Sequence, residues 1–397
     1  MKNAKERTVG TVVRGIRTPI IKKGDNLVDI VVASVLKCAE NENFTFSDRD
    51  IVGVTEAVVA KAQGNYVSLD TVGKDINNKF GNEVGVIFPI LSRNRFSLIL
   101  AGIARGVKKC YVQLNYPNDE VGNPIANPDK IYANGINPYT DEFTEEEYKK
   151  IFTREDRINP FTGVDILDYY KNLSDNIEII FSNNPASILK YTKNVLVSDI
   201  HTRFRTKETI KKAGAEIVYS LDEVVNESID GWGYNEKYGV LGSNIANGTT
   251  LKLFPRDCEN FVNSLADKLC AATNKQIEVL IYGDGAFKDP QFKIWELADP
   301  VVSPAYTKGL EGVPNEVKIK YLADNQFKDL NGAELEKAIK EYVKNKESDL
   351  KASMQSQGTT PRKITDLLGS LCDLSSGSGD KGTPVVLIQG YFDNISS

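Results

Sequence analysis

Residues 377–388 read Gly-Ser-Gly-Asp-Lys-Gly-Thr-Pro-Val-Val-Leu-Ile, which places three glycines between a predicted helix (364–374) and a predicted buried strand (385–388). Glycine lets the backbone approach a ligand closely and adopt a positive φ, so its N–H groups can converge on an anion. Lys381 would add a point charge suited to phosphate, and Asp380 a hard oxygen suited to magnesium. The same residue types also build ordinary turns, and that alternative stays open.

The composition is that of a soluble globular protein: 397 residues, 41% hydrophobic and 26% charged. This length predicts two domains or three. The net charge of -5, with no Lys/Arg-rich block, argues against nucleic-acid binding. The charged start of the chain is not a secretory signal, and no apolar stretch approaches the roughly 20 residues of a membrane span. We therefore expect a cytoplasmic protein with no membrane contact.

Cysteine and histidine usage narrows the chemistry. The five cysteines are widely spaced without a CxxC pair, which excludes a usual zinc site and fits a reducing compartment. The single histidine, His201, would have to carry any Ser-His-Asp triad or histidine-rich metal site alone. Carboxylates, lysines and backbone amides are therefore expected to do most of the chemistry.

Alternating strand and helix patterns predict an α+β fold with mixed β-sheets. The stretch 116–161, rich in Asn, Pro, Asp and Tyr, is interpreted as a long surface excursion with one acidic helix over 145–151. Helices are also predicted over 27–39, 96–105 and 334–354, and strands over 8–14, 51–55, 84–91, 110–114, 177–181, 195–199, 217–219 and 278–282.

Four segments place polar groups at the ends of predicted strands, where α/β proteins usually bind ligands: 15–25, 54–64, 118–123 and 198–205. Thr55 would begin a helix, with Lys61 placed to reach a phosphate. The alternative is a helix cap and a surface lysine. Asp119 and Asp199 are a natural pair for magnesium, which binds carboxylates together with substrate phosphates.

Two arginines follow Asp199 and could clamp a carboxylate or phosphate through the planar guanidinium: Arg203 and Arg205. His201, between Asp199 and these arginines, is either a minor ligand or a loop residue.

Taken in this order, the segments resemble the coenzyme F(420):L-glutamate ligase family, the γ-glutamyl ligases of deazaflavin cofactor synthesis. The motifs that carry the resemblance are GIRTPIIKKGD (15–25), TEAVVAKAQG (55–64), DEVGN (119–123), VSDIHTR (197–203) and LSSGSGDKGTPVV (374–386). The resemblance extends over residues 10–124, 195–206 and 360–392.

The resemblance implies a ligase in which GTP, or ATP, transfers its γ-phosphoryl group to an acceptor carboxylate, whose acyl phosphate is then attacked by the amine of L-glutamate. Mg²⁺ or Mn²⁺ would assist, the acceptor would be a deazaflavin or a folate, and the protein would be a homodimer. The implied catalytic residues are Asp119, Asp199 and Arg203, and the implied metal ligands are Asp119, Asp199 and Asp380. The implied nucleotide-binding residues are Thr18, Pro19, Thr55, Glu56, Lys61, Asn123, Gly377, Ser378, Gly379, Lys381 and Gly382.

The chain departs from the family pattern in three ways. Ile200 stands where the family has threonine, and the spacing from Asp119 to Asn123 is one residue longer, so that Glu120 is an alternative acting carboxylate. Residues 207–357 separate motifs that lie closer together in short members. We therefore expect a γ-glutamyl-ligase-like core from residues 1–206 and 358–397, and an inserted α/β segment from residues 207–357.

Two functions of other classes remain open. One is a non-catalytic nucleotide-binding regulator of the same fold, which Ile200 and the long insertion would suit. The other is an NAD-dependent oxidoreductase based on residues 282–285 (YGDG). The second is weak because Lys288 stands at the position of the third glycine of the dinucleotide fingerprint.

Overall fold

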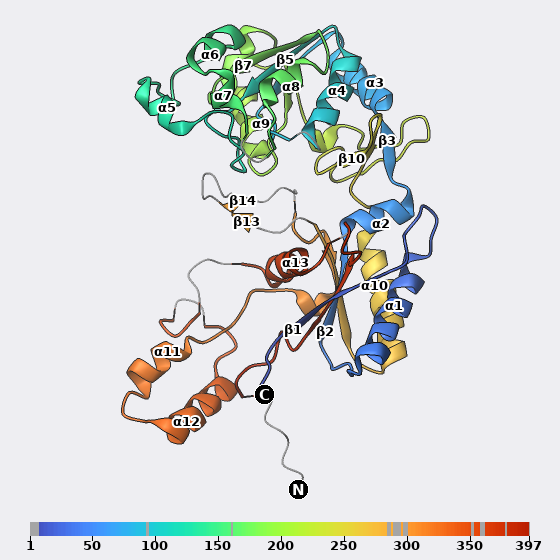
Figure 1. Cartoon of the computed structure of the whole chain (residues 1–397), viewed down its shortest axis with the longest axis vertical. Coiled ribbons are helices and arrows are strands. Elements are labelled where there is room, and N and C mark those ends of the chain that lie inside the picture. The colour runs from blue at the N-terminus through green and yellow to red at the C-terminus, as the bar shows by residue number, and fades with distance from the viewer. Residues whose placement is uncertain are drawn as a thin grey trace.

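The computed structural model describes residues 8–92, 95–159, 162–283, 287–288, 295–296, 301–350, 353–357, 362–377 and 379–396. The chain forms two bodies, each built around its own sheet (Figure 1). We call them the six-stranded unit (66–254) and the five-stranded unit (8–65 with 255–396). The chain crosses from one unit to the other twice.

The six-stranded unit is a mostly parallel sheet in the order β6-β7-β5-β4-β8-β9, with β6 antiparallel at one edge. From β4 the chain steps outward through β5 to β7 and then returns to pair β8 with the other side of β4. At such a reversal the loops after neighbouring strands diverge and leave a crevice at their carboxyl ends. The strands are β4 (Glu83–Ile87), β5 (Lys109–Leu114), β6 (Phe143–Thr144), β7 (Ile177–Phe181), β8 (Asn194–Val197) and β9 (Ile217–Ser220).

Alternating strand residues of this sheet pack on opposite faces. Val86 joins the large core beneath α3 (Leu69–Phe80) and α4 (Phe96–Gly106), whereas Ile87 packs with η1 (Pro185–Lys190) and α9 (Arg203–Lys212). Helices α3 and α4 lie very close, because a Cβ on Gly106 would stand only 2.2 Å from the Gly73 carbonyl oxygen. The unit's remaining helices are α5 (Pro128–Ala133), α6 (Glu145–Ile151), α7 (Arg154–Arg157), α8 (Ile166–Lys171) and η2 (Leu221–Glu223).

The stretch predicted to be a surface excursion is in fact part of the core. Tyr116, Tyr148 and Phe152 are fully buried, and the Tyr148 ring stacks on Phe181 of β7 at a centroid distance of 3.7 Å. Polar composition suggested exposure, but aromatic residues at intervals along the stretch bury more apolar surface than its Asn and Asp residues expose. The acidic helix α6 has the bounds that the sequence predicts.

The five-stranded unit has the order β1-β16-β2-β12-β15, in which β2 and β12 are parallel and the other pairs antiparallel. Helices α1 and α10 cover one face and α13 covers the other. The elements are β1 (Val12–Ile16), α1 (Leu27–Glu42), β2 (Asp50–Thr55), α2 (Glu56–Gln63), α10 (Cys258–Thr273), β12 (Ile277–Tyr282), β15 (Ala305–Tyr306), α13 (Ile364–Ser375) and β16 (Val385–Gln389).

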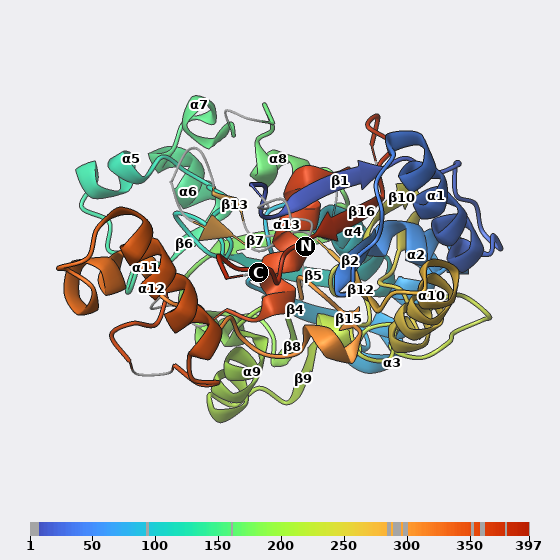
Figure 2. The ribbon, with the colours of Figure 1, turned by 90° about the horizontal axis from the view of Figure 1, so that it is seen from below.

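Figure 2 shows that α11 and α12 stand on the far side of the five-stranded unit from α1 and α10. The other elements of this unit are β13 (Phe287–Lys288), β14 (Trp295–Glu296), η3 (Lys308–Leu310), α11 (Ile319–Tyr321), η4 (Leu322–Gln326) and α12 (Gly332–Asn345).

Hydrogen bonds from Asn65 tie the two crossings together. Its side-chain amide donates to the carbonyl oxygens of Tyr234 (3.0 Å) and Phe254 (2.7 Å), and its Oδ1 accepts from the Tyr234 N–H. A small sheet in the order β10-β11-β3 lies beside this junction: β10 (Asn244–Asn247), β11 (Thr250–Lys252) and β3 (Tyr66–Ser68).

The α+β fold with mixed sheets agrees with the sequence prediction. The sheets, however, group the chain differently from the division that we expected. Strand β9 extends the six-stranded sheet and β12 lies between β2 and β15, so the stretch 207–357 contributes to both units. The reason is that strand pairing depends on partners distant in sequence, which local patterns do not reveal.

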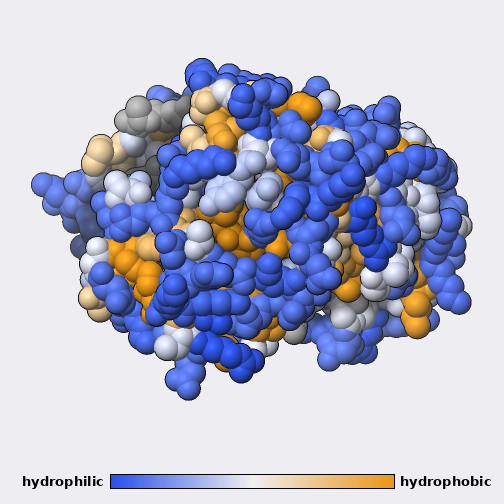
Figure 3. All heavy atoms as spheres, turned by 90° about the horizontal axis from the view of Figure 1, so that it is seen from above, coloured by the Kyte–Doolittle hydropathy of each residue, from blue (hydrophilic) through white to orange (hydrophobic). Residues whose placement is uncertain are grey.

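No helix in the described part of the chain is long and apolar enough to cross a membrane. Figure 3, which looks onto the outer side of the six-stranded unit, shows a largely hydrophilic surface with several apolar areas between the hydrophilic ones.

Candidate functional site

Asp119 and Asp199, the two carboxylates that the sequence singled out, line one cavity of about 430 Å³. Asp119 follows β5 and Asp199 follows β8, so both lie at the carboxyl edge of the six-stranded sheet, near the reversal of strand order. The cavity, called here the carboxylate cavity, is lined by Phe88, Asn115, Asn118, Asp119, Glu120, Asn183, Pro185, Asp199, Thr202, Arg205, Thr206 and Thr209.

Asp119 is saturated by N–H donors. Its Oδ1 accepts from the backbone N–H of Val121 (3.0 Å) and Asn123 (2.8 Å), and its Oδ2 from Leu91 N–H (2.6 Å) and the Asn123 amide (2.8 Å). Burial raises the pKa of this carboxyl, and the N–H donors oppose that rise. Asp119 therefore holds its own loop to the loop after β4, and Asn123 serves it as a partner.

Asp199 has one satisfied and one unsatisfied oxygen. Its Oδ2 accepts from the hydroxyls of Thr202 (2.5 Å) and Thr206 (2.8 Å) at the start of α9. Its Oδ1 is buried without a hydrogen-bond partner. Burial raises the pKa of this carboxyl, and the hydroxyls of Thr202 and Thr206 and the charge of Arg203 only partly oppose that rise. A buried, unpartnered carboxylate oxygen is where a cation would bind.

Glu120 brings a second carboxylate to the same place. It accepts hydrogen bonds from the backbone N–H groups of Ile200 and His201, the two residues after Asp199. Burial raises the pKa of Glu120, and the negative charge of Asp199 raises it further. Two neighbouring carboxylates, one with a free buried oxygen, fit a magnesium or manganese ion that takes its remaining ligands from phosphates and water.

This geometry favours Glu120 over Asp119 as the second carboxylate, since both oxygens of Asp119 are already in use. Asp380 does not line the carboxylate cavity and lies exposed in the C-terminal turn, so the predicted set of three aspartates does not form. Among the residues that the structure describes, no group of three or more His, Cys, Asp or Glu side chains could hold a metal ion.

Arg203 does not line the cavity. Its Nη1 donates to the Ile200 carbonyl oxygen, and its Nε lies 3.3 Å from Asp222 Oδ1. Arg205, two residues further along α9, lines the cavity instead. The predicted catalytic role of Arg203 therefore lacks the necessary geometry, because its guanidinium already serves the loop that carries Asp199.

A second cavity, of about 270 Å³, lies between the units and is called here the junction cavity. It brings together Thr55, Glu56 and Gly377, three residues that the sequence predicted to bind the nucleotide. Lys252 of β11 joins them through 2.8 Å contacts with both carboxylate oxygens of Glu56. The lining residues are Thr55, Glu56, Ala57, Arg95, Asn244, Ile245, Lys252, Tyr282, Gly283, Asp373, Ser376 and Gly377.

The C-terminal glycine loop is a tight turn. The Gly377 N–H donates to the Thr383 carbonyl and hydroxyl oxygens, and the Gly382 N–H donates to the Gly379 carbonyl oxygen. These amides are therefore used within the loop. They do not converge on an anion, although the sequence predicted that they would. Gly382 has a φ of +63°, which explains its identity. Gly379 and Lys381 are exposed, and the predicted residue Ser378 lies outside the described residues.

The other predicted nucleotide-binding residues lie at the same edge of the five-stranded sheet but line neither cavity. Thr18 donates its hydroxyl to the Pro19 carbonyl oxygen in the loop after β1. That loop reaches α2, where the Gly24 N–H donates to the Ala62 carbonyl oxygen at 2.8 Å. Lys61 is an exposed residue in the last turn of α2.

The loop after β4 connects the two cavities. Leu91 donates its N–H to Asp119 of the carboxylate cavity, and Arg95 lines the junction cavity. These residues are four positions apart, so their Cα atoms lie at most about 14 Å from each other.

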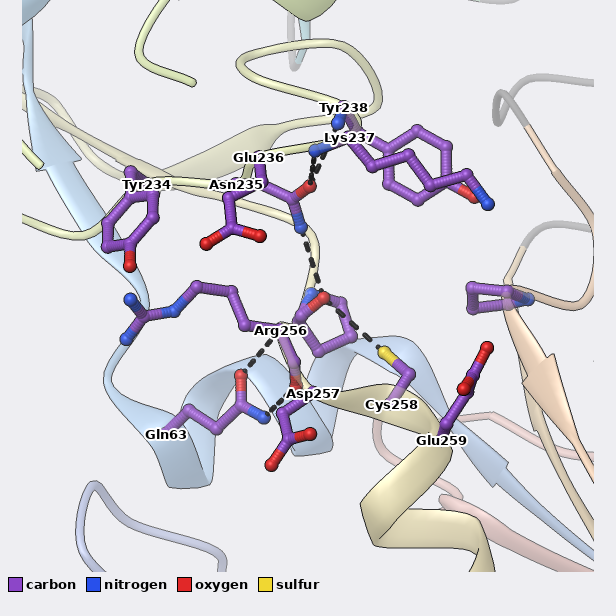
Figure 4. A pocket seen from close by; sticks show the side chains of 12 residues that line it. Gln63, Tyr234, Asn235, Glu236, Lys237, Tyr238, Arg256, Asp257, Cys258 and Glu259 are labelled. Atoms are coloured by element: carbon purple, nitrogen blue, oxygen red, sulfur yellow. Dashed lines mark hydrogen bonds between the residues drawn. The ribbon is translucent and has the colours of Figure 1, made fainter. Parts of the chain in front are cut away.

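A third cavity, of about 760 Å³, lies at the crossings (Figure 4). Several of its polar side chains form hydrogen bonds with the backbone of residues 254–256, at the second crossing. Gln63 bonds both backbone groups of Arg256, and the buried Asn235 amide donates to the carbonyl oxygens of Phe254 and Pro255. The Cys258 thiol donates to the Pro255 carbonyl oxygen. These hydrogen bonds give the polar side chains around this cavity a structural role, which is to hold the backbone of the crossing in place.

Sequence patterns missed Arg95 and Lys252. Lys252 lies in a stretch for which no element was predicted, and nothing local marks it. Arg95 directly precedes the predicted helix over 96–105. A cation at the start of a helix that follows a strand could have marked Arg95 as a candidate site residue.

The profile of the F420-0:Gamma-glutamyl ligase family matches residues 15–390, nearly the whole chain. The chain belongs to this family. A member of the F420-0:gamma-glutamyl ligase family is a ligase that forms an amide bond, as the sequence resemblance implied. Among curated proteins, none matches the chain.

Proposed function

We propose that this ligase uses GTP or ATP to attach L-glutamate to a small-molecule carboxylate acceptor, a deazaflavin such as F420-0 or else a folate. The observation that supports a nucleotide-driven reaction most directly is the carboxylate cavity. It pairs Asp199 and Glu120 beside the N-terminus of α9, an arrangement suited to a divalent cation and phosphate groups.

In this proposal Asp199 Oδ1 and Glu120 hold Mg²⁺ or Mn²⁺, and Thr202 and Thr206 orient Asp199. The cation would neutralise negative charge on the phosphates. Asp119 is a positioning residue that joins the loop after β5 to the loop after β4. Asn123 acts through Asp119.

The proposed reaction has two steps. An oxygen of the acceptor carboxylate attacks the γ-phosphorus, the bond to the bridging oxygen breaks, and the nucleoside diphosphate leaves with the electron pair. The amine of glutamate then attacks the acyl carbon, an amide C–N bond forms, inorganic phosphate leaves and the amine loses a proton. Most of the catalysis is positioning and charge neutralisation, which requires no histidine.

We assign the acceptor to the junction cavity. Arg95 brings a positive charge to the wall and Asp373 a negative one, and the ion-paired Glu56 and Lys252 offer polar contacts without net charge. Tyr282 and Ser376, hydrogen-bonded to each other at 2.6 Å, form a rigid part of the wall. A pocket between two units, with a few convergent polar groups, is a common setting for a small-molecule site.

We also propose that the protein acts as a homodimer. Strand β1 lies at the edge of the five-stranded sheet and, among the strands that the structure describes, pairs only with β16. A sheet edge of this kind can pair with a second copy. Sedimentation of the full chain would give the molecular mass, and a monomer at all concentrations would remove this part of the proposal.

The test of the function incubates the full chain with GTP or ATP, Mg²⁺ or Mn²⁺, L-glutamate and either F420-0 or a folate. Mass spectrometry follows addition of one glutamyl residue, and a phosphate assay follows nucleotide cleavage. We expect product only when nucleotide, metal and acceptor are all present, and loss of product in Asp199→Asn and Glu120→Gln. Product formed without nucleotide, or unchanged activity in both variants, would rule out the proposed chemistry.

A further inference from the structure

The helix that follows Asp199 carries two arginines, and their surroundings differ. Arg203 donates to the Ile200 carbonyl oxygen, pairs with Asp222 and packs its guanidinium 4.5 Å from the Phe204 ring centre. The side chains of Arg203 and Asp222 are only 13% and 14% exposed. Arg203 is thus committed to holding the loop in shape, although it occupies the arginine position of the family motif.

Arg205 stands in a different setting. It lines the carboxylate cavity on the same face of α9 as Thr202, Thr206 and Thr209, which recur at helical spacing. Its side chain is exposed, and no carboxylate of the described residues forms an ion pair with it. It is therefore a cation that faces a cavity and is available for a ligand.

The charge balance of the cavity indicates what that ligand would be. Glu120 and Asp199 need a divalent cation, because Asp199 Oδ1 is buried without a partner. Once that cation is bound, a nucleoside triphosphate still carries negative charge that the cation does not offset. A guanidinium offers paired N–H donors that match two phosphoryl oxygens. The N-terminus of α9, where the Thr202 side chain accepts no capping hydrogen bond from the first-turn N–H groups, adds positive potential.

We infer that Arg205, and not Arg203, clamps the terminal phosphoryl group of the nucleotide during its transfer to the acceptor. This inference rests on the proposed function and deepens it by assigning the phosphoryl subsite to the α9 face of the cavity. Arg205 stays protonated throughout: it stabilises the charge on the transferred group and exchanges no proton. The arginine of the family motif here supports Asp199 through the loop.

The first experiment measures affinity, with the full chain, Mn²⁺, and either a β,γ-imido nucleoside triphosphate or the corresponding diphosphate. Arg205→Ala should weaken triphosphate binding at least tenfold and leave diphosphate and Mn²⁺ binding unchanged. The matched control is Lys211→Ala, which removes a cation from the far end of the same helix and should change neither affinity. Equal loss of triphosphate and diphosphate affinity would overturn a clamp on the terminal phosphoryl group.

The second experiment measures turnover. Arg205→Ala should lower kcat by about 10³-fold or more, as for other arginines that stabilise phosphoryl transfer, and added guanidinium should restore part of it. Arg203→Lys should mainly lower thermal stability. If Arg205→Ala keeps wild-type kcat, the clamp assignment falls while the ligase function stands. If wild-type protein neither binds nor cleaves a nucleotide, the proposed function and the clamp fall together.

Discussion

Replacing Asp119 by asparagine separates a structural carboxylate from a metal ligand. Each oxygen of Asp119 accepts two N–H groups, from Val121 and Asn123 on one side and from Leu91 and the Asn123 amide on the other. An asparagine keeps one oxygen and turns an NH₂ group toward two donors. Two hydrogen bonds to a charged acceptor are lost, at about 1.5–3 kcal/mol each.

The gross loss is therefore about 3–6 kcal/mol, and removing a charge whose burial raises its pKa offsets part of this. We expect the variant to lose at least about 2 kcal/mol of stability. For a unit of this size that loss lowers Tm by at least about 4 °C. The measurement is thermal unfolding followed by circular dichroism in the presence of EDTA, so that no metal contributes.

The matched control is Glu120→Gln, whose amide oxygen can still accept from Ile200 and His201 and which removes a like charge beside Asp199. Its Tm in EDTA should stay within about 2 °C of wild type or rise, as for a substitution that breaks no buried network. If Asp119→Asn unfolds with wild-type Tm in EDTA while Glu120→Gln does not, the two roles are the reverse of those assigned here.

Further predictions concern packing, a buried hydrogen bond and pH. Gly53→Ala places a Cβ 2.5 Å from Cys372 Sγ, so it should cost about 1–3 kcal/mol in urea unfolding, and Cys372→Ala should restore part of that loss. Tyr282→Phe removes the 2.6 Å bond to Ser376 and should cost about 1 kcal/mol; no change would mean that water replaces the phenol oxygen. The pKa of Asp199 in the folded state is raised above its ordinary value of about 4. Below the ordinary value the carboxyl is protonated in both the folded and the unfolded state. Between the two values only the folded state keeps the proton, so the metal-free stability falls as the pH rises through that window. Asp199→Asn should lessen that fall, and equal pH profiles would contradict the assignment.

The sequence predicted the secondary structure well where one local pattern dominates. The helix over 145–151 and the strand over 177–181 have the predicted bounds, since a capping box begins the first and an unbroken apolar run defines the second. The helix predicted to end at Met354 ends at Asn345. Helices α3 and α10 were not predicted. In α3 the polar residues Thr71 and Asp75 are buried among the apolar ones, whereas the buried residues of α10 are apolar at ordinary helical spacing, a signal that the sequence did offer.

The placement of the loops could also be predicted, but not which of their polar atoms already have hydrogen-bond partners. Because strands of one direction end at one edge of a sheet, Asp119 and Asp199 were expected together and are together. Which carboxylate oxygens remain free depends on donors from other loops, such as the Leu91 N–H, 28 positions from Asp119 in the sequence. Spacing within a motif carries no information about such a donor.

The spacing between Asp119 and Asn123 bears on which carboxylate is available in the cavity. The loop folds back so that Asn123 donates both its backbone N–H and its amide to Asp119. That double contact satisfies Asp119 and leaves Glu120 to reach across to the loop that carries Asp199. We therefore expect the length of this loop to decide which of the two carboxylates is available. Deleting Val121 should therefore release Asp119 and displace Glu120, so Mn²⁺ affinity in this deletion would depend on Asp119, whereas in the wild type it depends on Glu120. Dependence on Glu120 in both proteins would show that loop length does not select the ligand.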